Sequence, residues 1–258
     1  MKSVKAKSFG TRYEVKRRLG KGSYGVVYLV EDHADHSGEI MKALKTIKLE
    51  GLEPEEYDSA VKEAKLMQDL KNPYIVKFID SFVDKQCLCI VTEYCEGGDL
   101  SSIILMNKQN DRFINEDKAI SWFIQMVLAT GYLHCKHMLH RDLKSSNIYI
   151  KNDCIKIGDF GISRLLTSTC EMAHTWIGTP YYMSPEALLH KGYNNKSDIW
   201  SLGVILYEMC ASKRPFLGST ITQYTKSVVD STIPKLPDLF SDQIQYLIEK
   251  SDLYGNIF

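Results

Sequence analysis

The segment HRDLKSSN, residues 140–147, places His, Arg, Asp, Lys and Asn within eight residues, directly after an apolar stretch. Asp142 can accept a proton from an attacking hydroxyl, and Lys144 can offset the negative charge of a phosphoryl group. The amide oxygen of Asn147 is a suitable ligand for a divalent metal. Charges this close together do not help a core, but they do fit around a polyphosphate and its metal ions.

A second acidic motif, DFG at residues 159–161, follows the apolar run CIKIG at 154–158, which we predict to be a strand. Asp159 can bind Mg²⁺ between the β- and γ-phosphates of a nucleotide. Phosphoryl transfer requires positioning and charge neutralisation more than covalent chemistry by the protein. We therefore predict a phosphoryl-transfer site in which Asn147 and Asp159 are the metal ligands.

A glycine-rich stretch, GKGSYG, occupies residues 20–25. A GxGxxG match alone is weak, because many such loops only tolerate glycine. Here VVYLV follows, which favours a strand over the helix of a dinucleotide-binding loop and so disfavours an oxidoreductase. We predict a hairpin tip whose backbone N–H groups lie over phosphates, where a Cβ would block the approach.

Lys45 is predicted to face inward and hold α- and β-phosphate oxygens, whereas Lys42 and Lys48 are predicted to be solvated. A buried ammonium needs a counter-charge, and Glu63 is the candidate. Taken singly, Lys45 also fits a solvated strand lysine, and Glu63 also fits an exposed acid on a helix face.

The elements that must position these residues change type along the chain. Apolar alternation and β-branched residues predict strands at 13–19, 26–32, 40–49, 75–83 and 87–95. Helical patterns cover 53–70, 115–134 with Asn115 as N-cap, and a buried helix at 199–210. We predict an α+β fold with a small β-rich lobe of about 95 residues and a larger helical lobe, hinged near Gly97–Gly98.

Composition excludes several classes of function. The 258 residues are 44% hydrophobic and carry 32 acidic and 32 basic side chains, so no basic excess favours nucleic acid or an anionic membrane. Seven cysteines without zinc-type spacing, and no secretory signal, predict a reducing intracellular environment. The apolar run at 199–210 is too short to cross a bilayer.

Two further blocks, GTPYYMSPE at 178–186 and SDIWSLG at 197–203, complete a set whose order and spacing chance does not produce. The set resembles a eukaryotic protein kinase over roughly residues 13–250. Lys144 and the first block are similar to serine/threonine rather than tyrosine kinases. EYCEGGDL at 93–100, together with DFGISR, GTPYYMSPEAL and NKSDIWSLG, resembles the NIMA-related (Nek) family.

The resemblance implies a bilobal kinase fold with an extension at 1–12, an N-lobe at 13–95, a C-lobe at 96–258 and an activation segment at 159–186. It implies transfer of the γ-phosphoryl of Mg-ATP to serine or threonine hydroxyls of protein substrates. It also implies an activating kinase or trans-autophosphorylation, no nucleic-acid or membrane partner, and work inside the cell in the cytoplasm, nucleus or cytoskeleton.

Residue roles follow from the same resemblance. Asp142, Lys144, Lys45 and Glu63 would be catalytic. Backbone groups of Glu93 and Cys95 would bind adenine, Thr92 would guard a deeper pocket, and Val27, Ala43 and Tyr149 would sandwich the ring. A hydrophobic spine would stack Met67, Phe78, His140 and Phe160. The full ATP-binding set would be Leu19, Gly20, Lys21, Gly22, Ser23, Tyr24, Gly25, Val27, Ala43, Lys45, Thr92, Glu93, Cys95 and Tyr149.

The resemblance also implies a switch. Thr175 would carry an activating phosphate that Arg141 binds, since bidentate arginine–phosphate bonds can order a loop. Other hydroxyls in the segment are Ser168, Thr169 and Thr179, the last of which we expect to hydrogen-bond near Asp142 and Lys144.

The sequence departs from the family at three places. Ser184 replaces the commoner Ala before Pro-Glu, and Ser145 stands where many kinases carry Pro. The family also continues past residues 240–250 with an Arg-Pro segment and a final helix, whereas this chain ends eight residues later. The arginine expected to pair with buried Glu186 is then absent, because Arg214–Pro215 does not match by position. A kinase-shaped binding module without catalytic activity is therefore the alternative prediction.

Overall fold

The computed structural model describes residues 8–22, 25–49, 64, 67–159, 180–230 and 232–253. The chain divides into two compact units, and the boundary between them falls between Glu96 and Gly97. Within the described ranges, no helix is long and apolar enough to span a bilayer. Several predicted functional residues lie outside the described ranges: Ser23, Tyr24, Glu63, Phe160, Ser168, Thr169, Thr175 and Thr179.

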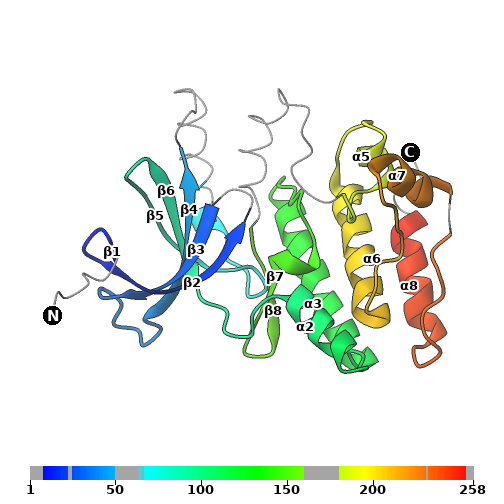
Figure 1. Ribbon diagram of the computed structural model, residues 1–258, viewed down its shortest axis with the longest axis horizontal. Coiled ribbons are helices and arrows are strands. Elements are labelled where there is room, and N and C mark those ends of the chain that lie inside the picture. Colours follow the sequence, from blue (N-terminus) through cyan, green and yellow to red (C-terminus); the bar gives the residue numbers. More distant parts are fainter. Residues whose placement is uncertain are drawn as a thin grey trace. The chain divides into compact units, whose positions relative to one another are not determined.

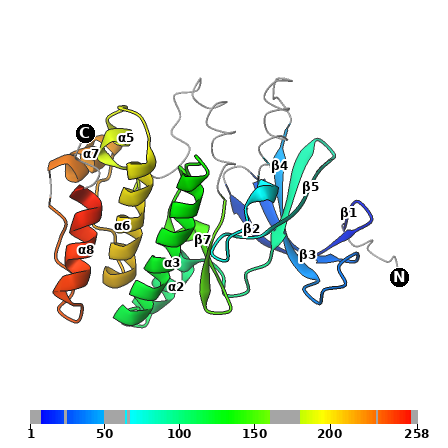
Figure 2. The ribbon, with the colours of Figure 1, turned by 180° about the vertical axis from the view of Figure 1, so that it is seen from behind.

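The first unit is built on a curled antiparallel sheet (Figures 1 and 2). Its strand order is β1-β2-β3-β4-β6-β5, so β1 and β5 form the edges. The five predicted strands are all present, which confirms the β-rich first part of the α+β fold. The bounds are β1 Ser8–Phe9, β2 Tyr13–Gly22, β3 Gly25–Asp32, β4 Met41–Lys48, β5 Phe78–Asp84 and β6 Cys87–Glu93.

Strand β5 begins three residues later than predicted, at Phe78 rather than at Ile75. The cause is a turn at Asn72, whose side chain accepts the amide of Tyr74 at 2.8 Å and whose carbonyl accepts the amide of Ile75 at 3.2 Å. In the predicted helix 53–70, only Ala64, the one-turn 3₁₀ helix η1, Met67–Asp69, and Leu70 are described.

One face of this sheet is covered by an apolar cluster that contains Phe9, Tyr13, Val30, Leu44 and Val91. The ring of Tyr13 stacks on Phe82 with 5.6 Å between centroids. Cross-strand pairing places Lys42 opposite Val30, so its side chain belongs to this covered face.

The prediction that Lys42 is solvated is therefore wrong, whereas Lys48 is exposed as predicted. Only 2% of Lys42 is exposed, and its ammonium contacts the Asp35 carboxylate at 2.6 Å and the Glu39 carbonyl. Alternation along β4 separates Lys42 from Lys45 correctly, but it does not show that the outer face is also covered.

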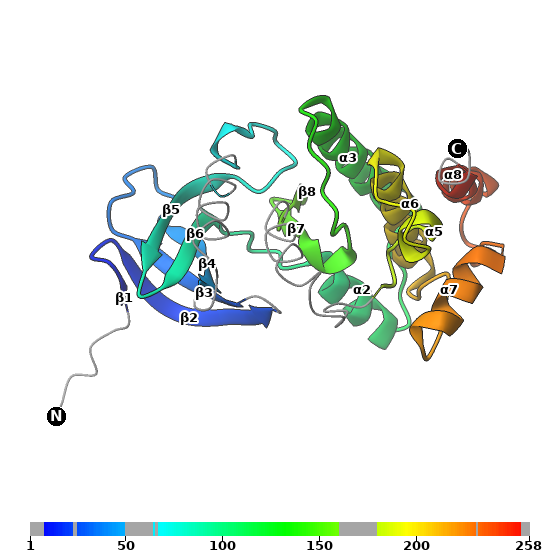
Figure 3. The same ribbon diagram turned by 90° about the horizontal axis from the view of Figure 1, so that it is seen from above.

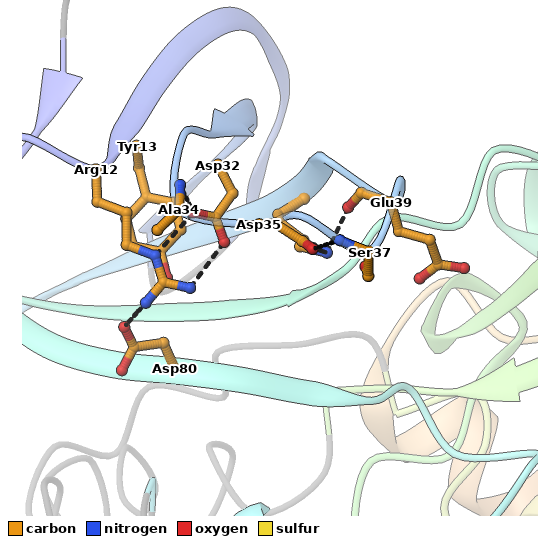
Figure 4. Close-up of polar contacts among 9 residues, drawn as sticks. Arg12, Tyr13, Asp32, Ala34, Asp35, Ser37, Glu39 and Asp80 are labelled. Carbon is orange, nitrogen blue, oxygen red and sulfur yellow. Dashed lines mark hydrogen bonds and ion pairs between the residues drawn. The ribbon is translucent and has the colours of Figure 1, made fainter.

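A charged cluster ties three segments of the first unit together (Figure 4). The Arg12 guanidinium donates to both oxygens of Asp32, at 2.7 and 2.8 Å, and to Asp80 at 3.2 Å. The hydroxyl of Tyr13 donates to Asp80 at 3.1 Å. The cluster joins the start of β2 to the end of β3 and to β5.

The second unit contains helices and one β-ribbon. Helix α6 lies between α3 and α8 and is almost entirely buried, as predicted for residues 199–210 (Figures 1 and 3). Asn115 caps α3, also as predicted, by accepting the Asp117 amide at 3.0 Å. The bounds are α2 Leu100–Gln109, α3 Glu116–Cys135, η2 Ser145–Asn147, β7 Ile148–Lys151, β8 Cys154–Ile157, α5 Pro185–Leu188, α6 Asn195–Ala211, α7 Ile221–Asp230 and α8 Asp242–Leu253.

Candidate active site

The ribbon β7–β8 brings the two predicted metal ligands to the same end of the second unit. Its register pairs Ile148 with Ile157, so Asn147 directly precedes one strand and Asp159 closely follows the other. The amide of Gly158 donates to the carbonyl of Asn147 at 2.9 Å and extends the pairing by one step. Residues far apart in the motifs thus become neighbours through a short antiparallel hairpin.

The predicted catalytic residues of the HRDLKSSN segment contact one another directly. Lys144 Nζ approaches the two carboxylate oxygens of Asp142 at 2.9 and 2.7 Å. The side-chain amide of Asn147 donates to the carbonyl of Asp142 at 2.8 Å and to its carboxylate at 2.9 Å. About a third of each charged side chain is exposed, 32% for Asp142 and 34% for Lys144, so solvent or a substrate can reach them.

The donor set fits a hard divalent cation. Because the Asn147 NH₂ group is directed at Asp142, the amide oxygen is the group that remains for a metal, and Asp159 supplies a carboxylate. No cluster of three or more His, Cys, Asp or Glu side chains suited to a metal occurs among the described residues.

The carboxylate of Asp159 accepts a hydrogen bond within the second unit, because the hydroxyl of Tyr149 donates to Asp159 Oδ2 at 3.2 Å. Tyr149 is half-buried on β7, where the resemblance places it against adenine. Asp159 itself has a φ of +58°, in the left-handed region that a non-glycine residue adopts only when its surroundings enforce it.

His140 is held as a neutral imidazole beneath the segment. The amide of Asp142 donates to His140 Nδ1 at 3.3 Å, so the ring proton is on Nε2, which donates to the Gly158 carbonyl at 3.1 Å. Burial lowers the pKa of His140, partly offset by the charge of Asp198. The neutral ring therefore links the catalytic segment to the residue that precedes Asp159.

Asp198 is the organising residue for which sequence reasoning assigned no role. Its fully buried carboxylate accepts the backbone amides of His140 at 3.0 Å and Arg141 at 3.1 Å. It also accepts from His134 at 2.7 Å and from Tyr193 at 2.5 Å. The sequence did contain a signal for this role, because an acidic residue in the apolar helix that contains SDIWSLG must have its charge paired.

Burial alone would raise the pKa of Asp198, but the hydrogen bonds from His134, Tyr193 and the His140 backbone hold it below its usual value. Asp198 therefore stays ionised and fixes two consecutive amides of the catalytic segment against α6. The strained backbone of Arg141, with a φ of +67°, is held by one of these bonds. The Arg141 side chain itself is exposed.

The first unit gathers its predicted nucleotide residues on one face of the sheet. Register pairs Val27 with Lys45 and Ala43 with Thr92, and Gly20 lies opposite Val27. Directly opposed residues in antiparallel strands share a face, so these side chains lie opposite to the apolar cluster. Lys45 is half-buried on this face. Leu19 and Lys21 flank Gly20 on β2.

Two of the glycines differ in what they require. A Cβ on Gly25 would lie 1.6 Å from the carbonyl oxygen of Thr46, so packing within the sheet already demands glycine there. A Cβ on Gly20 would meet nothing within 4 Å. A bound ligand is therefore not needed to explain the glycine at position 25. Gly22 ends β2, and Gly25 begins β3.

The segment that leaves β6 contains the predicted adenine contacts. Glu93 and Cys95 are both buried, and the Glu93 side chain accepts the amide of Lys77 at 2.8 Å. Thr92 donates to the carbonyl of Glu93 at 3.2 Å. Of the predicted spine, Met67 is buried and Phe78 half-buried in the first unit, and His140 is buried in the second.

Glu186 is half-buried rather than buried, and only one of its oxygens is satisfied. Oε1 accepts the Ser197 hydroxyl at 2.5 Å, whereas Oε2 is buried and has no hydrogen-bond partner within the described part of the chain. Arg214 lies elsewhere, with its guanidinium 4.0 Å from the centroid of Tyr181 and 3.9 Å from Glu208. This agrees with the expectation that Arg214 is not the partner of Glu186.

A curled β-sheet unit, a helical unit and a paired Asp–Lys–Asn segment beside a DFG motif together define a protein kinase. The chain belongs to the protein kinase domain family, whose pattern matches residues 13–252. Within this family the chain is similar to the NIMA-related kinases, as the motifs predicted.

Three relatives illustrate the similarity. Human serine/threonine-protein kinase Nek11 is 48% identical over 238 residues, covering 92% of this chain and 37% of the relative. Human Nek5 is 39% identical over 241 residues, covering 93% and 33% respectively. Rice Nek3 is 40% identical over 240 residues, covering 92% and 40%. The chain therefore spans well under half the length of these relatives.

Proposed function

We propose that this chain transfers the γ-phosphoryl group of Mg-ATP to serine or threonine hydroxyls of protein substrates. The observation that carries the proposal is the contact of Lys144 and Asn147 with one carboxylate, that of Asp142, next to the ribbon end that bears Asp159. The names of the Nek relatives and the family match support the same reaction class.

Asp142 would orient the acceptor hydroxyl and take its proton as the new bond from that oxygen to the γ-phosphorus forms and the bond from the γ-phosphorus to the bridging oxygen breaks, releasing ADP. The ammonium of Lys144, which contacts Asp142, would turn toward the phosphoryl oxygens and neutralise the negative charge that develops on them. Asn147 Oδ1 and Asp159 would hold Mg²⁺, which supplies charge neutralisation on the phosphates. Asp198 would keep the segment in place through the two backbone amides.

The proposal extends to the first unit. Lys45 would hold the α- and β-phosphates with Glu63 as its counter-charge, and Leu19, Val27, Ala43 and the backbone of Glu93 and Cys95 would hold the adenine. The Nek resemblance also assigns Tyr149 to adenine binding. The shared sheet face of Val27, Ala43, Lys45 and Thr92 supports this assignment.

Regulation and place of action are proposed from the Nek resemblance. Phosphorylation of Thr175, by another kinase or in trans, would create a ligand for the exposed Arg141. A Thr175→Ala protein that is as active as the parent would exclude this switch. We propose that the protein acts inside the cell, in the cytoplasm, in the nucleus or at the cytoskeleton or centrosome, on protein partners.

The test is transfer of radiolabelled phosphate from ATP to a generic protein substrate, with Mg²⁺ and with EDTA, followed by phosphoamino-acid analysis. Label on phosphoserine or phosphothreonine that requires Mg²⁺ supports the proposal. A melting-temperature increase with Mg-ADP but no transfer would instead favour a kinase-shaped binding module. Label on tyrosine would contradict the serine/threonine assignment.

A further inference from the structure

Ser145, which departs from the proline common at its position, is in contact with the second unit's core. It is the first residue of η2, between Lys144 and Asn147, and only 1% of it is exposed. Its hydroxyl lies 2.9 Å from the hydroxyl of Tyr182. The proposed phosphoryl-transfer mechanism does not use this serine.

Tyr182 is in turn bound to α6 at two points. Its carbonyl accepts the hydroxyl of Ser201 at 2.8 Å, and its own hydroxyl donates to Glu208 Oε2 at 2.6 Å. Ser201 and Glu208 are separated by two helical turns on α6 and are both buried. Tyr182 is therefore held along its length against the most buried helix of the unit.

The direction of the hydrogen bonds follows from the single proton of the phenol. Since that proton is directed to Glu208, the Ser145 hydroxyl must donate to the Tyr182 oxygen. Burial, reinforced by the charge of Glu208, raises the pKa of Tyr182, so the phenol keeps its proton at neutral pH. Arg214, 3.9 Å from the other oxygen of Glu208, supplies a cation to this buried carboxylate.

We propose that Ser145, by donating to Tyr182 and through it to Glu208, positions the turn that carries Lys144 and Asn147. We call these three residues the Ser145 relay. The relay would hold the turn against α6, as Asp198 holds the residues that precede it. The inference rests on the proposed function and adds positioning residues to it, and none of the three touches the reacting atoms.

The geometry explains why the hydroxyl matters. The backbone carbonyl of Lys144 accepts the amide of Asn147 at 2.9 Å, and the backbone carbonyl of Ser145 accepts the amide of Ile148. The turn therefore moves as one piece, and a shift of Ser145 displaces both of its functional neighbours. Proline could not donate this bond, so a chain with proline there would need another support.

The test compares Ser145→Ala, Tyr182→Phe and the double variant with the parent. Ser145→Ala should lower kcat about fivefold, as the loss of one ordinary hydrogen bond does, and Tyr182→Phe, which also removes the bond to Glu208, should lower it at least as much. Both changes should raise the Mg²⁺ concentration for half-maximal rate several-fold. The double variant should be no worse than the poorer single one, since both changes break the same relay. The Mg²⁺ dependence of ADP binding, followed by melting temperature, gives a readout without catalysis.

Tyr181→Phe is the matched control, because the hydroxyl of this adjacent tyrosine has no hydrogen-bond partner among the described residues. It should retain the parent's kcat and Mg²⁺ dependence. If the parent is active and the Ser145→Ala and Tyr182→Phe proteins have the parent's kcat and Mg²⁺ dependence, the relay is overturned but the proposed function is not. The relay is also overturned if the loss of kcat in the double variant equals the product of the two single losses. Lower melting temperatures with unchanged Mg²⁺ dependence would also overturn it. A parent that neither transfers phosphate nor binds ADP overturns the proposed function, and the relay with it.

Discussion

The ammonium of Lys144 contacts both carboxylate oxygens of Asp142, at 2.9 and 2.7 Å. The two residues lie two positions apart, on either side of Leu143, which is 2% exposed and anchors the segment in the core. The pair is therefore held by the fold rather than by chance proximity of two surface side chains. The proposed function assigns both charges to the same bound group.

The first prediction concerns Lys144. Lys144→Met should lower phosphoryl transfer about 100-fold, because the cation that stabilises developing charge is lost. The melting temperature should change little, since a third of the side chain is exposed and the ion pair contributes little to folding.

The control is Lys118→Met, which removes a lysine of similar exposure from its ion pair with Asp153. This protein should transfer phosphate at the parent rate. Equal losses in both variants would show that the Lys144 effect is not specific to the site.

The second prediction concerns Asp198. Asp198→Asn should destabilise the protein by about 2–4 kcal/mol, because it leaves buried donors from His134, Tyr193 and the catalytic segment poorly satisfied. Urea unfolding measures the change. Asp230→Asn, at the exposed end of α7, should stay within about 0.5 kcal/mol of the parent. A stable Asp198→Asn protein would mean that the buried carboxylate is dispensable.

The third prediction concerns acid. The hydrogen bond from Arg12 holds the pKa of Asp32 below its usual value. A lowered folded-state pKa gives stability that is complete above the ordinary carboxyl value, about 4, and is lost as pH falls through the folded-state value. The parent should therefore lose stability steeply below about pH 4.

Asp32→Asn should be less stable than the parent at pH 6, and its melting temperature should fall less between pH 5 and pH 3. Asp69→Asn, an exposed change, should follow the parent curve. Identical pH profiles for Asp32→Asn and the parent would contradict the role assigned to Arg12 and Asp32.

The fourth prediction compares two lysines of β4. Lys42→Ala should cost about 1–3 kcal/mol of unfolding free energy, because the carboxylate of Asp35 loses its partner and a buried stem is removed. Lys48→Ala, on the exposed end of the same strand, should cost less than about 0.5 kcal/mol. Equal stabilities in urea would rule out a structural role for Lys42.

Sequence patterns predicted the strands of the first unit and the protein kinase family well, because alternation and fixed spacing are local properties. They misplaced Lys42, since alternation separates the two faces of a strand but does not say whether both are covered. They also missed the pairing of Asp198 with His134, because a contact across 64 positions depends on how α3 and α6 pack, and its local contact with Tyr193, five positions earlier in the segment that enters α6. Gly25 was assigned to a ligand although the adjacent strand already excludes a Cβ.

Asp142 provides the most direct measurement of the central claim, which is phosphoryl transfer by this chain. The rate of Mg-ATP-dependent serine/threonine phosphorylation should be compared in the parent and in Asp142→Asn, with ADP binding measured for both. We predict a loss of about 1,000-fold in rate with ADP affinity nearly unchanged, because the residue acts on the acceptor hydroxyl. Equal rates in the two proteins, or nucleotide binding without transfer by the parent, would contradict the account.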